Sequence, residues 1–449
     1  MAAVTAGPPV TIARRPRVLV VSPVAVGREL AGAAIRPFEI ARAMQEHADV
    51  VLAVPPSADP PTGVALFAFA YQEPATLAPA LDWADAVVAQ PQKPLLTRMM
   101  VRAGARLIYD LYVPEPLELL EAHSGKPVPV RETAHALSLD RVSNALRTAH
   151  HVICATEAQR DLWLGIAFGQ RLIGPGAYDR DPTLRSSIDV VPSGLPVDPP
   201  RAVPARGIRS ALPAIASDDE VVLWNGGIWA WLDAPTAVEA IDRLRRRRPQ
   251  ARLVFMGRGG HEAAAAATAR TEELARRLGL LGETVFFNPA WVPYGERASW
   301  LLEADVAISC HVEHLETRFA FRTRLLDCFW SGLPVVCTEG DELAARVRRE
   351  DLGEAVPQRD PEAVAAALDR VLERGRAAYA GRFDAARAAY SWPHVVGPIA
   401  DWLGRDAPPR LGARRVGARR PAHVARDIAY IGARSTLNRI GLRRWPSGG

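Results

Sequence analysis

Cysteine and long apolar runs are scarce in this 449-residue sequence. Its four cysteines form no Cys-x-x-Cys pair and have no regular spacing, which excludes a disulfide framework and a zinc knuckle and fits a reducing, cytoplasmic environment. No stretch of about 18 uninterrupted apolar residues is present, so the sequence predicts no membrane-spanning helix. A mean hydropathy of −0.02 and a charged fraction of 23% are typical of a folded, water-soluble protein.

The motifs of several common enzyme classes are also absent. There is no G-x-S-x-G elbow, no Walker A lysine loop and no Cys/His dyad spacing, which excludes the common hydrolases, P-loop enzymes and thiol enzymes. The run HVEHLE (311–316) contains His and Glu residues, but its spacing matches no zincin pattern. We therefore expect no metal site.

What is present is a regular alternation of short β-branched runs with longer Ala-, Leu-, Arg- and Glu-rich segments of helical period. This pattern predicts βαβ units stacked into parallel sheets. The expected strands form a first series, 17–22, 49–54, 85–90, 106–111, 151–156 and 188–194, and a second series, 220–227, 251–257, 283–288, 304–310 and 333–340. The sequence thus predicts an α/β protein with two Rossmann-like parallel-sheet domains that face each other across a cleft.

The expected domain organisation follows from these series and from the proline-rich stretch between them. It comprises a disordered N-terminus (1–16), a first, acceptor-side domain (17–193), a linker (194–207), a second, nucleotide-binding domain (208–403) and a basic helical tail (404–449). Helical segments 361–380 and 382–403 are expected to continue the second domain.

The tail differs in charge from the rest of the chain. It contains 11 arginines against 2 aspartates, so it carries +9 while residues 1–403 sum to about −4. Val424, Ile428 and Ile431 share one face of a predicted helix bordered by arginines, a pattern typical of a helix on an anionic bilayer. A terminal helix docked on the body is the alternative. Because the body is not basic, no nucleic-acid partner is expected.

Loops that follow the strands are the candidate ligand site, because open α/β sheets bind ligands outside the carboxyl ends of their strands. Gly32 precedes a helix expected to begin near Ala33, and Arg36 lies one turn into it. Free amide groups at such a helix start bind phosphate or sugar oxygens. The alternatives are a simple turn and a surface salt bridge of Arg36.

The corresponding loops of the second domain are also rich in glycine. Gly226 and Gly227 permit close backbone approach after the strand 220–227, and Gly257 with Arg258 follows the next strand. Asp233 is expected to cap a helix rather than bind a ligand.

Tryptophan is dense after the first strand of the second domain. Trp224 ends the strand and is expected to fill the core, whereas Trp231 is a candidate for stacking on a base or sugar ring, as is Trp291 in a later loop.

Two arginines stand at the start of a helix predicted from Phe321 to Gly332. Arg322 and Arg324 there form a plausible diphosphate cradle, because guanidinium groups bind phosphate oxygens in a bidentate manner. The alternative is a surface ion pair between Arg324 and Asp327, three residues apart.

Over about residues 17–400 the chain resembles the retaining, nucleotide-sugar-dependent glycosyltransferases of GT-B architecture, family 4 (group 1). DVVPSGLPVD (189–198) is similar to the V-I-P-N-G-V-D of that family, and DCFWSGLPVVCTEGDELA (327–344) is similar to its E-A-M-A-x-G-x-P-V-V-A-x. The two motifs at this separation are a fairly specific combination.

The resemblance implies roles for several residues. In the family a glutamate five residues before the helix-ending glycine contacts the donor ribose, and Asp327 occupies that position. A second glutamate, eight residues earlier, lies near the transferred sugar; here Phe319 replaces it, and Glu316 is a possible substitute. Asp110, at the end of a first-domain strand, is nearest to the position where related enzymes often have an acceptor-side histidine, and a structural cap is its alternative role.

The family also places an Arg and a Lys after the second-domain glycine loop, and this sequence has neither. We expect Arg322 and Arg324 to compensate by stabilising the departing diphosphate. The implied reaction moves a sugar from a nucleotide diphosphate sugar to a carbohydrate, a lipid-linked glycan or a small molecule, with retention and without metal or other cofactor. The expected location is cytoplasmic, with the tail on the inner face of the cell membrane. A nucleotide-sugar epimerase of the same fold and a non-catalytic scaffold partner remain as alternatives.

Overall fold

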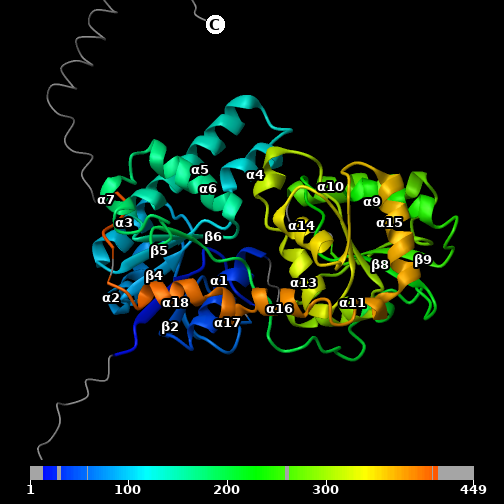
Figure 1. Cartoon of the computed structure of the whole chain (residues 1–449), viewed down its shortest axis with the longest axis horizontal. Coiled ribbons are helices and arrows are strands. Elements are labelled where there is room, and N and C mark those ends of the chain that lie inside the picture. Colours follow the sequence, from blue (N-terminus) through cyan, green and yellow to red (C-terminus); the bar gives the residue numbers. More distant parts are fainter. Residues whose placement is uncertain (1–13, 28–31, 58, 258–261, 407, 413–449) are drawn as a thin grey trace, which may run out of the picture.

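The computed structural model describes residues 14–27, 32–57, 59–257, 262–406 and 408–412. Two α/β domains lie side by side along the long axis of the molecule (Figure 1). Each is built on a wholly parallel sheet, as the alternation of strand and helix patterns predicts.

Seven strands form the first sheet, in the order β3-β2-β1-β4-β5-β6-β7. They are β1 (Arg17–Val21), β2 (Asp49–Val54), β3 (Ala65–Ala68), β4 (Ala86–Ala89), β5 (Arg106–Asp110), β6 (His151–Cys154) and β7 (Ile188–Val190). Alternate residues of β1 pack into two apolar clusters, with Val18 and Val20 in one and Leu19 and Val21 in the other. Both faces of the sheet are thus covered, which accounts for its nearly unbroken apolar strands.

Six strands form the second sheet, in the order β10-β9-β8-β11-β12-β13. They are β8 (Glu220–Trp224), β9 (Ala251–Phe255), β10 (Val285–Phe287), β11 (Val306–Ser309), β12 (Val335–Thr338) and β13 (Gly353–Val356). Strand order reverses between β8 and β11, so the loops after these two strands flank a topological switch point where α/β sheets bind ligands.

Helices connect and cover the strands of both domains. Those of the first domain are α1 (Gly32–Met44), α2 (Ala78–Trp83), α3 (Pro94–Ala103), α4 (Glu115–Ala122), α5 (Val128–Thr148), α6 (Glu157–Gly169) and α7 (Pro175–Tyr178). Those that follow are α8 (Ile208–Ala211), α9 (Ala234–Leu244), α10 (Glu262–Arg277), α11 (Arg297–Glu303), α12 (Leu315–Phe319), α13 (Thr323–Ser331), α14 (Glu342–Arg349), α15 (Pro361–Arg374), α16 (Asp384–Tyr390), α17 (Trp392–Val395) and α18 (Gly397–Leu403).

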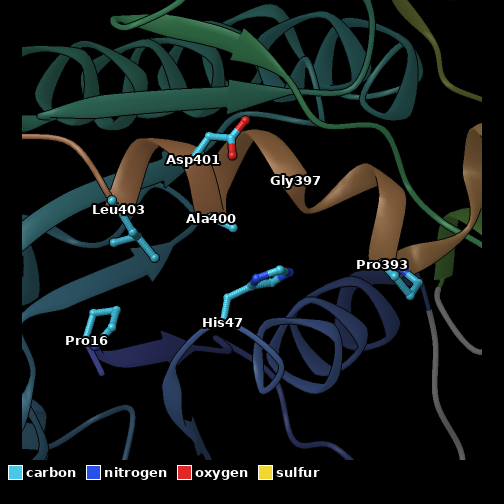
Figure 2. A pocket seen from close by; sticks show the side chains of 8 residues that line it. Pro16, His47, Pro393, Gly397, Ala400, Asp401 and Leu403 are labelled. Atoms are coloured by element: carbon cyan, nitrogen blue, oxygen red, sulfur yellow. The ribbon is translucent and has the colours of Figure 1, made fainter. Parts of the chain in front are cut away.

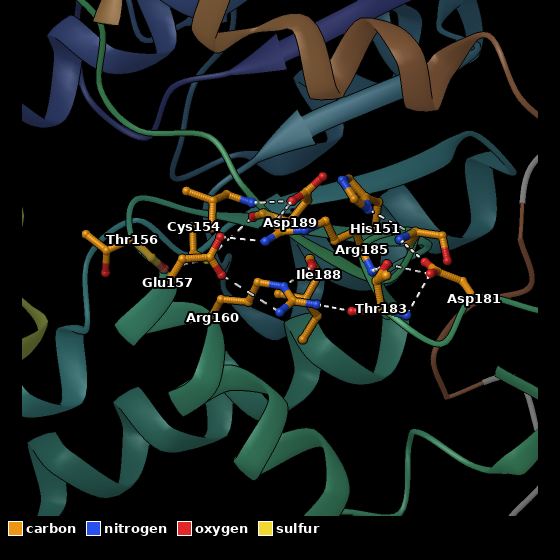
Figure 3. Close-up of polar contacts among 12 residues, drawn as sticks. His151, Cys154, Thr156, Glu157, Arg160, Asp181, Thr183, Arg185, Ile188 and Asp189 are labelled. Carbon is orange, nitrogen blue, oxygen red and sulfur yellow. Dashed lines mark hydrogen bonds and ion pairs between the residues drawn. The ribbon is translucent and has the colours of Figure 1, made fainter. Parts of the chain in front are cut away.

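A charged network fastens α6 to the edge of the first sheet (Figure 3). The Arg185 guanidinium bonds Glu157 of α6 at 2.6 Å and Asp189 of β7 at 2.5 Å. Arg160 of α6 donates to the carbonyl of Ile188 at 2.8 Å. The network fixes the helix that faces the second domain.

The chain returns to the first domain after α16. Figure 1 shows α17 and α18, in orange, lying over the first domain rather than the second. The Trp402 indole donates to the Ser186 carbonyl at 3.2 Å, and Arg106 donates to the Leu403 carbonyl at 2.8 Å. The segment 382–403 therefore differs from its expected place as a simple continuation of the second domain.

An open cavity of about 320 Å³ lies beneath this returning segment, between it and the start of the first domain (Figure 2). His47 and Asp401 are among the residues that line it.

The linker is held against the same segment. Leu195 exchanges backbone hydrogen bonds with Tyr390 and Trp392, at 2.7 and 3.1 Å. A Cβ on Gly194 would lie 2.5 Å from the Trp392 ring, so glycine is required for this close approach. The Pro-rich stretch thus lies against the crossover between the domains.

Of the tail, only its first residues are described. Leu411 is buried in the first-domain core, and its amide donates to the Ala149 carbonyl at 2.8 Å. The predicted amphipathic helix, within 413–449, lies outside the described residues, as do residues 1–13. Within the described part of the chain, no helix combines the length and apolarity needed to cross a bilayer.

Candidate active site

The carboxyl edge of the second sheet brings together the loop after β8 and the start of α13. The Asn225 side-chain amide donates to the Arg324 carbonyl at 2.7 Å. Gly226 has φ +127°, a conformation that favours glycine, and a Cβ there would lie 3.7 Å from the Arg324 guanidinium. Gly257 lies beside Gly226, because its Cβ would meet the Gly226 backbone at 3.9 Å. Gly226, Gly257 and Arg324, three of the predicted site residues, are therefore neighbours.

Arg324 lies over this glycine loop with its charge uncompensated. One guanidinium nitrogen, Nη2, donates to the Gly227 carbonyl at 3.1 Å, while Nη1 is buried without a hydrogen-bond partner. Among the described residues no carboxylate forms an ion pair with Arg324. Burial, and secondarily the charge of Arg322, lower the pKa of Arg324 to about 10. Both effects favour an anion beside this group.

Arg322 does not face the glycine loop as the sequence predicts. Its side chain is 2% exposed and forms an ion pair with Asp341, the residue that caps α14. Further hydrogen bonds run to the carbonyls of Thr338, at 2.6 Å, and Ser309, at 3.3 Å. These contacts occupy most of its donors, so Arg322 fixes β11, β12 and α14 together. The expected pair of phosphate-facing arginines is thus reduced to Arg324. Arg322 also lies one residue before α13, as its N-cap, and not within the first turn.

Several buried polar atoms near this edge lack hydrogen-bond partners. They are Asn225 Oδ1, Ser309 Oγ, His311 Nδ1, His314 Nε2, Glu316 Oε2 and Arg324 Nη1. Each such group costs about 1–3 kcal/mol when it is left unpaired. Their concentration around one sheet edge fits a polar ligand with several hydrogen-bonding groups.

His311 and His314 both belong to this set of unpartnered groups. Burial, followed by the charges of Arg322 and Arg324, holds the pKa of His311 well below its usual value, so its ring is neutral. His314 caps α12 by accepting from the Thr317 amide at 3.3 Å. Within the described residues, no group of three or more His, Cys, Asp and Glu side chains is placed to hold a metal ion.

Asp327 lies on α13 but does not pair with Arg324. Its carboxylate instead accepts from Arg297 of α11 at 3.0 Å. The Arg297 guanidinium stacks over the Tyr294 ring at 3.6 Å, and the Tyr294 hydroxyl donates to Glu39 of the first domain at 3.3 Å. The Asp327 side chain remains 33% exposed, so part of its carboxylate is available to a ligand.

The candidate tryptophans differ in burial. Trp224 is fully buried, as the sequence predicts. Asp233, which follows them in the chain, caps α9 by accepting from the Thr236 amide at 3.3 Å. Trp231 is partly buried and stacks on Trp229 at 5.4 Å between ring centroids. Trp291 is 41% exposed in the loop after β10. The predicted site residue Arg258 lies outside the described residues.

In the first domain, Arg36 and Asp110 form a buried bidentate ion pair. The distances are 2.6 Å from Nε to Oδ2 and 2.9 Å from Nη2 to Oδ1, and the side chains are 2% and 5% exposed. Arg36 also donates to the Val191 carbonyl at 2.8 Å and stacks over Tyr112 at 4.8 Å. Gly32 begins the helix that carries Arg36. These contacts join α1, β5 and β7, which differs from the expected direct roles of Arg36 and Asp110 toward substrates.

Helix α12 of the second domain meets α4 and α6 of the first. Gln159 of α6 donates both to the Tyr112 carbonyl and to the Phe319 carbonyl of α12, each at 2.8 Å. One amide group therefore ties the end of β5 to the end of α12. It also fixes the position of Phe319, the residue found where the resemblance expects a glutamate.

Carboxyl groups from the two domains interact at this interface. Glu316 of α12 is 4% exposed, and burial, followed by Asp341 and Glu121, raises its pKa to about 7. Burial, followed by Glu316 and Glu115, raises the pKa of Glu118 of α4 to about 8. Both carboxyl groups therefore keep their protons to a higher pH than an ordinary glutamate does.

Comparison with known proteins finds a family match within the second domain. Residues 219–374 match the family model described as Glycosyl transferases group 1. The match covers most of the second domain and contains the motif at 327–344, whereas the motif at 189–198 lies outside it. No curated protein sequence matches the chain significantly.

Solved structures extend the likeness to both domains of the chain. Alr3699/HepE from Anabaena, in complex with UDP and glucose, is 14% identical with a TM-score of 0.63, over 87% of this chain and 99% of that one. WaaG, a glycosyltransferase involved in lipopolysaccharide biosynthesis, is 16% identical with a TM-score of 0.56, over 86% and 98%. Sucrose-phosphate synthase from Thermosynechococcus elongatus is 15% identical with a TM-score of 0.57, over 87% and 98%. At these identities the likenesses establish the GT-B fold.

Several residues of the site escape prediction from sequence. Asn225, Ser309 and Gln159 have no motif of their own, although the first two directly follow or end strands, which is where α/β sheets bind ligands. Glu118 carries no sequence signal, because only the packing of α4 against α12 brings it near Glu316.

Proposed function

We propose that this protein is a glycosyltransferase that transfers a sugar from a nucleotide diphosphate sugar to an acceptor, with retention at the anomeric carbon and without a metal ion. One observation carries the proposal. Arg324 holds an uncompensated, partly buried charge against the Gly226–Gly227 loop, with one guanidinium nitrogen unpartnered. A diphosphate would supply the missing negative charge and acceptor atoms.

The proposed chemistry follows from this placement. When the bond between the anomeric carbon and the diphosphate oxygen breaks, the leaving group gains negative charge, and a fixed guanidinium beside it lowers the barrier. The acceptor oxygen forms the new bond on the same face, and its proton passes to the departing diphosphate. Arg324 acts on the leaving group, Asp327 contacts the ribose, and Glu316 lies near the transferred sugar.

UDP is the first nucleotide to examine. The Anabaena protein was solved with UDP and with UDP-glucose, and a trehalose-6-phosphate protein from E. coli with UDP-2-fluoro glucose. We therefore propose a UDP-hexose as donor, with Trp231 and Trp291 as candidate stacking residues for the base or sugar.

The basic tail supports a proposed position on the inner face of the cell membrane. Its 11 arginines would be attracted to anionic lipids by about 1 kcal/mol for each arginine near the surface.

A nucleotide panel tests the proposal. Thermal unfolding of the full chain is followed with UDP, GDP and ADP, and UDP-glucose is then incubated with and without sugar acceptors. We expect stabilisation by one nucleotide diphosphate and acceptor-dependent release of UDP. Isomerised sugar from donor alone would support an epimerase instead, and no stabilisation by any nucleotide would contradict the proposed donor site.

A further inference from the structure

A series of buried contacts runs from the first domain to Asp327 of α13. The Tyr294 hydroxyl donates to Glu39 Oε1 of α1 at 3.3 Å, and the Arg297 guanidinium lies over the Tyr294 ring at 3.6 Å. Arg297 in turn donates from Nε to Asp327 Oδ1 at 3.0 Å. Glu39 is 4% exposed and the Arg297 side chain is 9% exposed, so these contacts are largely shielded from water.

Tyr294 holds Arg297 in more than one way. Besides the ring contact, the Tyr294 carbonyl accepts from Arg297 Nη1 at 2.7 Å. On its other side the guanidinium lies over the Trp330 ring of α13 at 4.7 Å. The guanidinium is therefore fixed between Tyr294 and α13.

Helix α11, which carries Arg297, also contacts the linker. The Val203 amide donates to Ser299 Oγ of α11 at 2.7 Å. The position of Arg297 is therefore set by the linker and, through Tyr294, by the first domain. A change in the relative position of the two domains would displace Arg297 and, with it, the Asp327 carboxylate.

We propose that Tyr294 is a positioning residue for the nucleotide ribose, because it fixes Arg297 and so orients the Asp327 carboxylate. Its hydrogen bond to Glu39 makes this orientation depend on the first domain. The inference rests on the proposed function, in which Asp327 contacts the ribose. A carboxylate that is already fixed loses less conformational freedom when a hydroxyl group binds it, so it binds that hydroxyl more tightly.

The exposure of Asp327 supports a contact with a ligand. The ion pair with Arg297 uses Oδ1, and the Asp327 side chain is 33% exposed. We assign the other oxygen, Oδ2, to the ribose hydroxyl groups. Arg324, three residues earlier on α13, donates to the Gly227 carbonyl of the glycine loop. The same helix would thus carry the contacts to the diphosphate and to the ribose.

Calorimetric titration of the full chain with UDP and with dideoxy-UDP, whose ribose lacks both hydroxyl groups, tests the inference. The ratio of the two affinities isolates the hydroxyl contacts. We expect UDP to bind the unmodified chain about tenfold more tightly, because a hydrogen bond to a charged group contributes about that much.

Two variants of Tyr294 separate its hydroxyl from its ring. Tyr294→Phe should lower the affinity ratio about threefold, by weakening the binding of UDP and not of dideoxy-UDP. Tyr294→Leu also removes the ring beneath Arg297 and should lower the ratio further. Tyr178→Phe, at a tyrosine 56% exposed on α7, is the matched control and should retain the ratio.

A double variant tests the link to the first domain. Glu39 also forms an ion pair with Arg42 at 3.1 Å, so Tyr294→Phe does not leave the carboxylate unpaired. We expect Glu39→Met to lower the affinity ratio as Tyr294→Phe does, and the double variant to lower it no further. Additive losses, or a ratio lowered only by Tyr294→Leu, would contradict the dependence on the first domain.

Other results would overturn the inference as a whole. A ratio that is unchanged in folded Tyr294→Phe and Tyr294→Leu does so, including the case in which both nucleotides lose affinity equally, as a merely structural role predicts. Equal binding of UDP and dideoxy-UDP by the unmodified chain does so as well, because Asp327 then makes no ribose contact. In each of these cases UDP still binds, whereas absence of UDP binding would contradict the proposed function itself.

Discussion

Two arginines separated by one residue have different roles in this protein. Arg322 forms a buried ion pair with Asp341, whereas Nη1 of Arg324, beside the glycine loop, has no hydrogen-bond partner. The sequence predicts that both stand at a helix start, but it does not reveal which one finds a carboxylate. That carboxylate lies 19 residues later in the chain, and only the packing of α14 against the sheet edge brings it to Arg322.

The Arg36–Asp110 pair gives a stability prediction at the same scale. Arg36→Met leaves a buried carboxylate without a partner, so we expect a loss of about 3–5 kcal/mol in urea unfolding of the first domain. Arg14→Met is the control, because the Arg14–Asp85 pair is 60% and 41% exposed and should contribute less than about 1 kcal/mol. A loss for Arg36→Met as small as that of the control would show that the pair is not buried in solution.

Glu118 gives a pH prediction. Its pKa is raised in the folded chain, so the folded state binds more protons than the unfolded state between the ordinary value of 4.5 and about 8. Stability should therefore fall as pH rises through this window. Glu118→Gln removes the titrating group, so its melting temperature relative to the unmodified chain should increase from pH 5 to pH 8. A constant difference across that range would contradict the raised pKa.

At the scale of elements, strands rich in β-branched and other apolar residues are predictable from the sequence, and strands that lack them are not. All eleven expected strands are present, because runs such as RVLVV are β-branched and buried on both faces. The two that are missed, β3 and β13, are short edge strands with only one β-branched residue between them. The bounds of the helices after Gly375 are also harder to predict than those of the earlier ones, because Gly and Pro residues divide 382–403 into three short helices.

A hydrogen bond from Gln159 of α6 is one of the contacts that hold α12 against the first domain. Gln159→Met keeps the side-chain size but removes the hydrogen bonds to the Tyr112 and Phe319 carbonyls and the one accepted from the Ala155 amide. We expect faster amide hydrogen exchange in 315–319 and a several-fold rise in the acceptor KM, with little change in UDP affinity. Gln170→Met, at the end of the same helix, is the control. Unchanged exchange in 315–319 would show that α12 is held by other contacts.

At the scale of the whole molecule, the sequence correctly predicts two Rossmann-like parallel-sheet domains. It does not show that the chain returns to the first domain after α16. Periodicity identifies helices in 382–403, whereas the surface on which they pack is set by Trp402, Arg106 and the linker contact of Leu195. These contacts link residues about 200–300 positions apart.

Two C-terminal truncations distinguish the contribution of residues 405–412 to stability from that of residues 413–449 to membrane binding. A chain ending at Gly412 keeps Leu411 in the first-domain core, so its melting temperature should match that of the full chain while binding to phosphatidylserine vesicles falls at least tenfold. A chain ending at Gly404 should also lose stability. Undiminished vesicle binding by the chain ending at Gly412 would contradict the proposed membrane role of the tail.

The central claim is that a diphosphate binds at Arg324, and calorimetric titration of UDP tests it most directly. Arg324→Ala should weaken UDP binding at least tenfold, while Arg246→Ala, at a side chain 76% exposed on the surface, should leave it unchanged. Circular dichroism confirms that both variants are folded. Equal UDP affinity in the unmodified chain and in folded Arg324→Ala would contradict the account.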